Sequence, residues 1–346
     1  MTHQMTRRSL LMSVPMLAAA RRLLAQEARP TLTLRALNHI AIAVSDKKRS
    51  MEFYQGLFGW PINHTQGGTQ GLNAGFSVGA TGIRVGSGPQ YITMSQGARP
   101  GWGHFCMTVE GFDVDRITQV LARHGVSRTR TSEAGPMKAW VRSRGPENGG
   151  ANEGTPEFYV NDPDGLRFQL QDRRYCGGPG VLGDGCPSVP PLESVLVVRD
   201  FQSFTLSVPN QERSLDFYQA LFGMTVKGLH GTVPMLGVGS GPQRLLIDGS
   251  AAAGATPRIT QACLVMDGFD PDKVQQALSQ FGVKPRGDAT GAPGPMVSWV
   301  RMRSEELGGA EGGTPELFFT DPDGIVIQLQ DASYCGGAGR LGNVCA

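Results

Sequence analysis

The second half of this sequence repeats the motifs of its first half, in the same order. The matching segments are RSMEFYQGLFG (49–59) with RSLDFYQALFG (213–223), GTPEFYVNDPDGLRFQLQD (154–172) with GTPELFFTDPDGIVIQLQD (313–331), and YCGGPGVLGDGC (175–186) with YCGGAGRLGNVC (334–345). A repeat of roughly 150 residues has the length of an ordinary domain, so it indicates a duplicated domain. We therefore expect an N-terminal copy at 31–186 and a C-terminal copy at 196–346, joined by a Pro-rich linker at 187–195.

Each copy contains one pattern of secondary structure twice. In the N-terminal copy, residues 37–44 have the apolar character of a strand, and residues 46–59 have helical spacing that stops at Gly59. Short strands follow, and the plan restarts with a strand at 103–110 and a helix at 113–125. The order strand–helix–strand–strand–strand thus occurs twice per copy. This order predicts an α+β fold of two half-open mixed β-barrels, each with its own core.

Residues 1–30 are typical of an export signal and leader. Paired arginines, Arg7 and Arg8, precede an apolar stretch that ends in three alanines at Ala20, which is the pattern of a twin-arginine signal. An ordinary cytoplasmic helix is the alternative, and the cleavage site is left open. The twin-arginine route carries folded proteins, so a metal acquired before export is consistent with it. We expect the mature protein in the periplasm or cell envelope.

The order of the motifs resembles the vicinal oxygen chelate (VOC) superfamily. F-Y-x-x-x-F-G follows the first strand of each copy, and DPDG precedes the last strand. The superfamily includes glyoxalase I, extradiol ring-cleaving dioxygenases, fosfomycin-modifying enzymes and bleomycin-binding proteins. The resemblance covers nearly all of 31–346 and implies two tandem VOC domains, each built from two βαβββ modules. It does not choose among the functions, because one fold carries many activities.

The two copies provide an internal control for function. Features present in both, such as DPDG and the Phe-Tyr pair after the first strand, are interpreted as turn and core. Only two of the six histidines, His39 and His104, lie on first strands of the modules, and both belong to the N-terminal copy. The C-terminal copy has Ser203 and Gln261 at those positions.

The resemblance implies a metal site at these positions. In the superfamily, one ligand comes from each first strand and a carboxylate comes from the last strand, which here gives His39, His104 and Gln169. Two imidazoles and one oxygen suit a single divalent transition metal such as Fe, Mn, Zn or Ni, although an amide lacks the charge of a carboxylate. Nearby Glu157 is a candidate for supplying that charge through water. The alternative is a metal-free barrel in which the histidines are satisfied interior residues, as we expect for the C-terminal copy.

Tyr159 is the candidate catalytic residue. It falls at the tyrosine position of the extradiol dioxygenase signature, where the C-terminal copy has Phe318, and its hydroxyl is suited to binding a substrate oxygen. The upstream histidine of that signature would fall near Asn152 and is absent. Packing within the strand is the alternative role. Outside the predicted signal, the other histidines, His64, His124 and His230, are assigned to exposed loops or a helix end.

The six cysteines form three aligned pairs: Cys106 with Cys263, Cys176 with Cys335, and Cys186 with Cys345. An even set at repeated spacing in an exported protein predicts disulfides, here Cys176–Cys186 and Cys335–Cys345. Cys106 and Cys263 lie inside apolar strands and are predicted to be buried free thiols. A thiolate ligand at Cys106 is the alternative.

Charge and hydropathy limit the partners. The chain has 32 basic and 30 acidic residues, which excludes a generally basic nucleic-acid binder, and no apolar run is long enough to span a membrane. We expect a small-molecule partner. The resemblance implies a glyoxalase-type lyase or isomerase, or an extradiol-type dioxygenase, acting on adjacent oxygens. The alternative is a non-catalytic ligand-binding protein of the bleomycin-resistance type.

Overall fold

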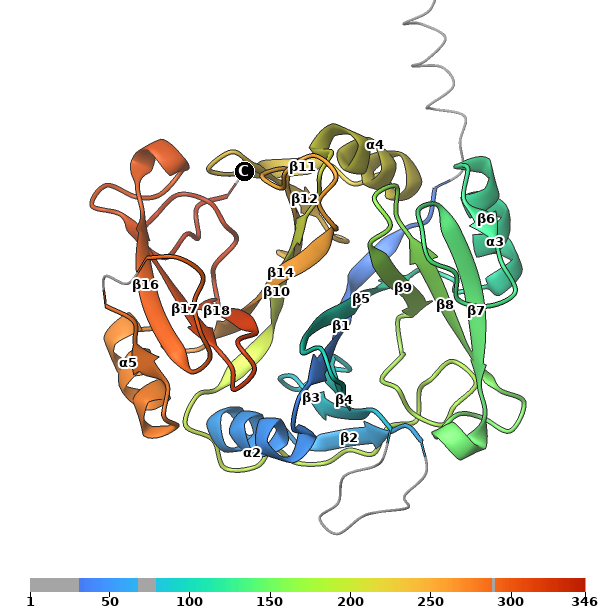
Figure 1. Cartoon of the computed structure of the whole chain (residues 1–346), viewed down its shortest axis with the longest axis horizontal. Coiled ribbons are helices and arrows are strands. Elements are labelled where there is room, and N and C mark those ends of the chain that lie inside the picture. The colour runs from blue at the N-terminus through green and yellow to red at the C-terminus, as the bar shows by residue number, and fades with distance from the viewer. Residues whose placement is uncertain (1–30, 68–78, 288–289, 346) are drawn as a thin grey trace, which may run out of the picture.

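The computed structural model of the chain describes residues 31–67, 79–287 and 290–345 (Figure 1). The predicted export signal at 1–30 lies outside the described residues. Within the described part, the chain has no helix with the length and apolar character needed to cross a membrane.

The N-terminal copy has the predicted order of elements. They are β1 (Leu34–Val44), α2 (Lys47–Phe58), β2 (Ile62–Thr65), β3 (Thr81–Arg84), β4 (Tyr91–Gln96), β5 (Gly101–Val109), α3 (Val114–Arg123), β6 (Ser127–Arg128), β7 (Lys138–Arg144), the 3-10 turn Pro146–Asn148, β8 (Thr155–Asn161) and β9 (Arg167–Asp172). The second module differs from the prediction only by the two-residue strand β6.

The C-terminal copy repeats this order. Its elements are β10 (Val198–Ser207), α4 (Gln211–Phe222), β11 (Val226–His230), β12 (Val233–Gly237), β13 (Arg244–Asp248), β14 (Arg258–Met266), α5 (Pro271–Gln280), β15 (Lys284–Pro285), β16 (Val297–Arg303), the 3-10 turn Glu305–Leu307, β17 (Thr314–Thr320) and β18 (Val326–Asp331).

Local sequence signals set the ends of the first helix. The side chain of Asp46 accepts a hydrogen bond from the Arg49 amide and caps the start of α2. Gly59 ends the helix in the left-handed region with φ of 66°. A Cβ at Gly59 would lie 2.4 Å from the carbonyl oxygen of Leu192, so this position also lets the segment between the copies pass close to the helix end.

Each copy forms one mixed nine-stranded sheet. The strand orders are β2-β3-β4-β1-β5-β9-β8-β7-β6 and β11-β12-β13-β10-β14-β18-β17-β16-β15. The first strands of the two modules, β1 and β5 or β10 and β14, are adjacent and antiparallel at the middle of each sheet. The fold is therefore α+β with tandem half-open barrels, as predicted.

The first helix of each copy packs on the sheet of the other copy (Figure 1). The hydroxyl of Tyr54 in α2 donates a hydrogen bond to Asp321 of the second DPDG turn at 3.0 Å. In the reciprocal contact, Tyr218 in α4 donates to Asp162 of the first DPDG turn at 3.1 Å. The two turns thus dock helices across the interface between the copies.

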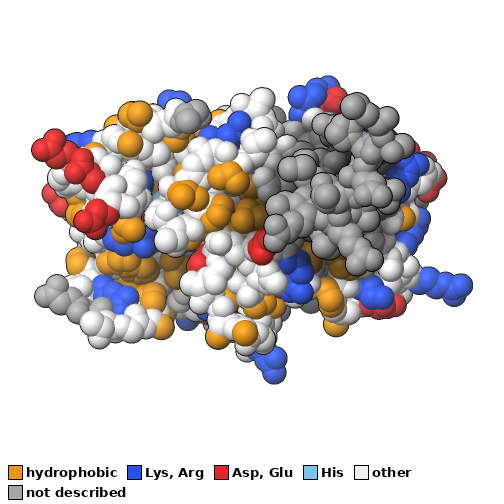
Figure 2. All heavy atoms as spheres, turned by 90° about the horizontal axis from the view of Figure 1, so that it is seen from above, with side chains coloured by type: hydrophobic (Ala, Val, Ile, Leu, Met, Phe, Trp, Pro, Cys, Tyr) orange, Lys and Arg blue, Asp and Glu red, His pale blue; other side chains and the backbone are white. Residues whose placement is uncertain are grey.

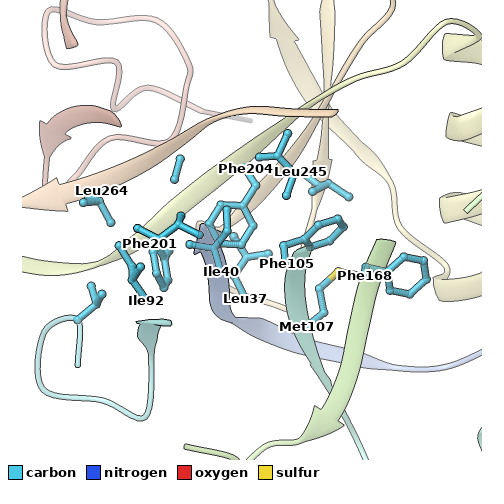
Figure 3. Packing of buried hydrophobic residues seen from close by; sticks show 14 of the residues in the cluster. Leu37, Ile40, Ile92, Phe105, Met107, Phe168, Phe201, Phe204, Leu245 and Leu264 are labelled. Atoms are coloured by element: carbon cyan, nitrogen blue, oxygen red, sulfur yellow. The ribbon is translucent and has the colours of Figure 1, made fainter. Parts of the chain in front are cut away.

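The prediction that each barrel has its own core is wrong, because one hydrophobic cluster runs through both copies. Figure 3 shows Ile40 and Phe105 of the N-terminal copy beside Phe201 and Phe204 of the C-terminal copy. The rings of Phe105 and Phe204 have centroids 6.0 Å apart. The middle strands of the two sheets therefore share one apolar layer. Each copy covers apolar side chains of the other copy that would otherwise be exposed to water.

The surface carries charges of both signs. Figure 2 shows acidic and basic side chains interspersed with apolar ones on one face of the molecule. This pattern agrees with the near balance of 32 basic and 30 acidic residues in the sequence.

Candidate metal centre

A row of paired residues crosses the N-terminal sheet on the face opposite the shared core. From β4 to β8 the row consists of Tyr91, His39, Cys106, Gln169 and Tyr159, each in register with the next. Residues paired in register point to the same side of a sheet, and so do residues two apart on one strand. His104 therefore joins the row two positions before Cys106.

The three predicted metal ligands meet on this face. Nε2 of His39 lies 3.1 Å from Oε1 of Gln169, and Nε2 of His104 lies 3.0 Å from the same oxygen. The two imidazole rings have centroids 5.5 Å apart and stand nearly at right angles. Among the described residues, no three His, Cys, Asp or Glu side chains form a metal-binding group, so the candidate set depends on the Gln169 amide.

Asn38 fixes the orientation of the His39 ring. Its Nδ2 donates a hydrogen bond to the carbonyl oxygen of Tyr175 at 2.8 Å, and its Oδ1 lies 2.8 Å from Nδ1 of His39. Because the Asn38 oxygen can only accept, Nδ1 of His39 carries the proton. A neutral His39 then presents the lone pair of Nε2 to Gln169.

Burial keeps both imidazoles neutral. Burial lowers the pKa of His39 well below its usual value, and the neighbouring His104 and His64 lower it further. Burial also lowers the pKa of His104 to about 4, against the opposing effect of its hydrogen bond to Gln169. As placed, Oε1 of Gln169 and the unprotonated Nε2 of His39 are two acceptors facing each other. Nε2 of Gln169 is buried, and no protein group bonds it in the described structure.

The equivalent positions in the C-terminal copy form an ordinary hydrogen bond. Strand register aligns Ser203 with His39, because they pair with Cys263 and Cys106 respectively. There, Nε2 of Gln261 donates to Oε1 of Gln328 at 2.9 Å. This bond corresponds to the contact between His104 and Gln169 in the N-terminal copy, and it joins a matched donor and acceptor.

Both carboxylate oxygens of Glu157 are bonded by other side chains, and we assign this residue a role in the fold. Its Oε1 accepts hydrogen bonds from Arg144 and Tyr175, both at 2.8 Å, and its Oε2 accepts one from Arg142 at 2.7 Å. Burial opposes ionisation of Glu157, but Arg142 and Arg144 hold its pKa below the usual range. Glu316 makes the matching contacts in the C-terminal copy. The suggestion that Glu157 supplies a charge to the metal through water therefore has no free oxygen to support it.

Tyr159 lines a cavity of about 320 Å³ together with His39, His104 and Gln169. Its hydroxyl donates to Oε2 of Glu157 at 3.2 Å. Burial, and then the charge of Glu157, raise the pKa of Tyr159. The phenol thus keeps its proton at neutral pH and acts as a hydrogen-bond donor.

His64 is buried beside the site, and its assignment to an exposed loop is wrong. It lies in β2 at 9 % exposure and contacts the edge of Tyr91, whose face stacks on His39. Asn63 orients it as Asn38 orients His39, by bonding Nδ1 of His64 and the carbonyl oxygen of Cys176. The Asn-His dipeptide occurs at both places, and this repetition was the sequence signal that could have revealed His64.

A glycine makes room for the His64 ring. A Cβ at Gly82 would lie 2.0 Å from Cε1 of His64. Strand register aligns His64 with Gly228 and Gly82 with Met235 in the C-terminal copy. Both copies therefore pair a large side chain with a glycine at this place. The glycine is on the second of the two strands in the N-terminal copy and on the first in the C-terminal copy. Among the other histidines, His124 is also buried at 9 % exposure, and His230 is half-buried against Glu316, so neither is an exposed residue.

The cysteines are arranged as predicted. Disulfides join Cys176 to Cys186 and Cys335 to Cys345, whereas Cys106 and Cys263 are buried free thiols. Burial raises the pKa of Cys106 well above its usual value, which disfavours a thiolate ligand. The first disulfide begins at Cys176, whose carbonyl oxygen binds Asn63, and it follows directly after Tyr175, whose carbonyl oxygen binds Asn38. It therefore helps to hold the two asparagines that orient His39 and His64.

A protein-family model matches both copies of the chain. The family model described as the Glyoxalase/Bleomycin resistance protein/Dioxygenase superfamily matches residues 36–170 and 200–329. The chain belongs to this superfamily. It contains two tandem VOC domains, which confirms the resemblance seen in the sequence. No curated relative matches the chain.

Solved structures of this superfamily have the same fold at low sequence identity. One is the Mn(II)-bound glyoxalase from Novosphingobium aromaticivorans, with 15% identity and a TM-score of 0.58 over 86% of this chain and 82% of that one. Another is homoprotocatechuate 2,3-dioxygenase from Arthrobacter globiformis, with 15% identity and a TM-score of 0.57 over 88% and 81%. The enzyme from Brevibacterium fuscum, in complex with 3,4-dihydroxyphenylacetate, has 14% identity and a TM-score of 0.58 over 87% and 82%.

Proposed function

We propose that the N-terminal copy binds one divalent transition metal through His39, His104 and Gln169 and acts on a small substrate with two adjacent oxygens. The observation that carries this proposal is the convergence of two neutral imidazole nitrogens on one amide oxygen, at 3.1 and 3.0 Å. When bound, the ion would supply Lewis-acid polarisation of the substrate oxygens. The choice between a lyase or isomerase and a dioxygenase is left to the assay.

The donor set fits a metal ion. Ligand bonds of about 2.0–2.2 Å at right angles place neighbouring donor atoms about 3 Å apart, which is the spacing between Oε1 of Gln169 and each of the two histidine nitrogens. The Asn38 contact gives His39 the tautomer a metal requires, with Nδ1 protonated and Nε2 free. A cation between Nε2 of His39 and Oε1 of Gln169 would also relieve the opposition of two acceptors.

The side chains around the cavity would bind and orient the substrate. Arg142 lines the cavity next to Tyr159, and its guanidinium is half-exposed although it is paired with Glu157. It would attract a negatively charged substrate oxygen. Tyr159, which keeps its proton, would donate a hydrogen bond to a substrate oxygen by turning from Glu157. We retain Tyr159 as the candidate catalytic residue on this basis.

The second candidate is a metal-free ligand-binding protein. Turning the Gln169 amide by 180° would direct its NH₂ group at both imidazoles and remove the opposed acceptors without a cation. The cavity would then hold a small ligand without chemistry, as in the bleomycin-resistance type. Metal analysis separates the two candidates.

The test uses matched variants of the two copies. We expect the purified chain, stripped with a chelator and then loaded separately with Mn, Zn, Ni or anaerobic Fe(II), to bind one equivalent of at least one of these metals. His39→Ala and His104→Ala should abolish binding, whereas Ser203→Ala and Gln261→Ala should leave it unchanged. No metal uptake by the wild type would leave only the ligand-binding candidate, whereas equal losses in the C-terminal variants would contradict the placement of the site in the N-terminal copy.

Restoring the carboxylate gives a second readout. Gln169→Glu adds a negative charge at the metal, so it should raise metal affinity at least about tenfold. Gln328→Glu, the matched change, should create no site because the C-terminal copy lacks both imidazoles. For the loaded wild type, oxygen uptake with a catechol would indicate a dioxygenase, since a lyase or isomerase consumes no oxygen.

We also propose export by the twin-arginine route to the periplasm or cell envelope, based on Arg7 and Arg8 in the sequence. The two disulfides are compatible with an oxidising compartment. Replacing both arginines with lysines should retain the protein in the cytoplasm in a fractionation experiment. Unchanged distribution of the variant would contradict this route.

A further inference from the structure

A second cavity adjoins the candidate metal centre where the two copies meet. It has a volume of about 350 Å³ and shares Gly103 and His104 with the first cavity. Its wall contains Trp102 and Arg167 from the N-terminal copy and Arg258 from β14 of the C-terminal copy. His104 thus lies between the metal centre and a chamber built by both copies.

The second cavity has positive charge with no acidic residue in its wall. Its charged lining residues are Arg167 and Arg258, and neither forms a salt bridge within the described parts of the chain. The Arg167 guanidinium lies 4.7 Å above the Trp140 ring and donates one hydrogen bond, to Oγ of Ser132 at 3.1 Å. Its Nε is buried without a described partner. A guanidinium has five N–H donors, so most of the binding capacity of Arg167 is unused.

Both arginines are specific to the chamber beside the histidines. Strand register places Val326 at the position equivalent to Arg167, since they pair with Thr320 and Asn161 respectively. It places Gly101 at the position equivalent to Arg258. The chamber related to this one by the duplication would therefore lack both positive charges. The arginines have the same one-sided distribution as His39 and His104.

We propose that this chamber binds the carboxylate group of the substrate, so that the substrate is a small carboxylic acid whose other end carries the two adjacent oxygens. The inference deepens the proposed function and rests on it for the placement of the oxygens. Planar guanidinium groups match a carboxylate with paired hydrogen bonds. Trp102 contributes an apolar part of the chamber wall. The C-terminal copy contributes Arg258, so it takes part in substrate binding although it has no metal ligands of its own.

The first test measures binding of benzoate to the metal-stripped protein, with neutral benzamide as the comparison, by isothermal titration calorimetry. We expect benzoate to bind at least tenfold more tightly than benzamide. Arg167→Gln and Arg258→Gln should each weaken benzoate about tenfold and leave benzamide unchanged. Arg123→Gln, which alters an exposed arginine of α3, should have no effect on either.

A variant that keeps the positive charge controls for the possibility that Arg167→Gln fails to fold. Arg167→Lys keeps the charge but not the paired hydrogen bonds, so its affinity for benzoate should fall between those of the wild type and Arg167→Gln. Equal affinity for benzoate and benzamide, or full benzoate affinity in both glutamine variants, would overturn the proposal.

The second test joins the chamber to the metal centre. With Mn(II)-loaded protein, 3,4-dihydroxybenzoate should bind at least tenfold more tightly than catechol, and Arg258→Gln should remove this preference. Loss of metal binding in His39→Ala addresses the proposed function alone, because benzoate binding to the stripped protein does not depend on it. The two proposals therefore fail separately. If benzoate binds the chamber but the loaded protein shows no preference for the dihydroxy acid, the assignment of the carboxylate to the substrate is wrong.

Discussion

Glu316→Gln should destabilise the protein at neutral pH, and much of this effect should disappear in acid. Oε1 of Glu316 accepts hydrogen bonds from His230 at 2.7 Å and Arg303 at 2.9 Å, and Oε2 accepts from Arg301 at 2.6 Å. Arg303 is 1 % exposed, so the variant would leave a buried guanidinium without its counter-ion. Removing one partner of a buried ion pair costs about 3–5 kcal/mol.

The pKa of Glu316 gives an independent magnitude and the sign. Burial opposes ionisation, but His230 and then Arg301 lower the pKa of Glu316 from 4.5 to about 2. A carboxyl with a lowered folded-state pKa stabilises the protein above its unfolded-state pKa, and this contribution is lost as the pH falls toward 2. The shift corresponds to about 3 kcal/mol in total, of which about 1.5 kcal/mol is already lost at pH 3.5.

Urea unfolding at pH 7 and pH 3.5 checks both numbers. The free energy of unfolding of Glu316→Gln should be about 3–5 kcal/mol below that of the wild type at pH 7, and the difference should shrink by about 1.5 kcal/mol at pH 3.5. Glu157→Gln is the matched change in the N-terminal copy, and a similar loss at pH 7 is expected because its two arginines and its tyrosine match those of Glu316. A difference that does not vary with pH would refute the linkage argument, and a near-neutral Glu157→Gln would refute the assignment of both carboxylates to the fold.

Three further predictions concern contacts that the duplication makes comparable. Tyr218→Phe removes a hydrogen bond to a buried aspartate of the other copy and should lower the free energy of unfolding by about 1.5–3 kcal/mol; an unchanged urea midpoint would contradict this docking role. Gly82→Met should be strongly destabilising because the new side chain would clash with the His64 ring. Adding His64→Gly should recover about 1 kcal/mol or more of the free energy of unfolding, since it recreates the pair found in the C-terminal copy. Strictly additive losses in thermal unfolding would refute the exchange of positions. Replacing Cys176 and Cys186 with Ser should cost about 2–3 kcal/mol from loop entropy, and a melting temperature insensitive to this change and to reductant would show that the loop is held by other contacts.

The repeated order of elements could be predicted from the sequence because it depends on local periodicity, whereas the three candidate ligand positions were implied by the family resemblance. Apolar alternation sets the strands, and positions two apart on a strand share a face. His104 and Cys106, two residues apart on β5, accordingly lie on the same side. The pairing of β1 with β5 and of β5 with β9 then brings His39, His104 and Gln169 together, as the duplicated pattern and the family resemblance indicated.

The shared core and the burial of His64 could not be predicted in the same way, because both depend on contacts between distant segments. The strand that carries Phe105 has the same apolar sequence pattern whether the residues that pack on it belong to its own copy or to the other copy. His64 is buried only because glycines lie against its ring, Gly82 on β3 and Gly177 next to Cys176. Arg258 and His104 line one cavity because of the packing of the two copies, for which the sequence offers no periodic signal.

The comparison of the copies indicates how a duplicated fold can specialise. The C-terminal copy keeps Glu316 with its arginines, the DPDG turn and the docking helix α4, which are the parts that stabilise the sheet and the interface. It lacks both imidazoles, and its Gln261–Gln328 hydrogen bond lies at the position equivalent to the candidate metal centre. Since the apolar layer is shared, removing this copy would expose the N-terminal sheet to water. Selection can therefore relax on its chemistry while its packing is retained, and a residue such as Arg258 can be recruited at the interface to serve the site of the other copy.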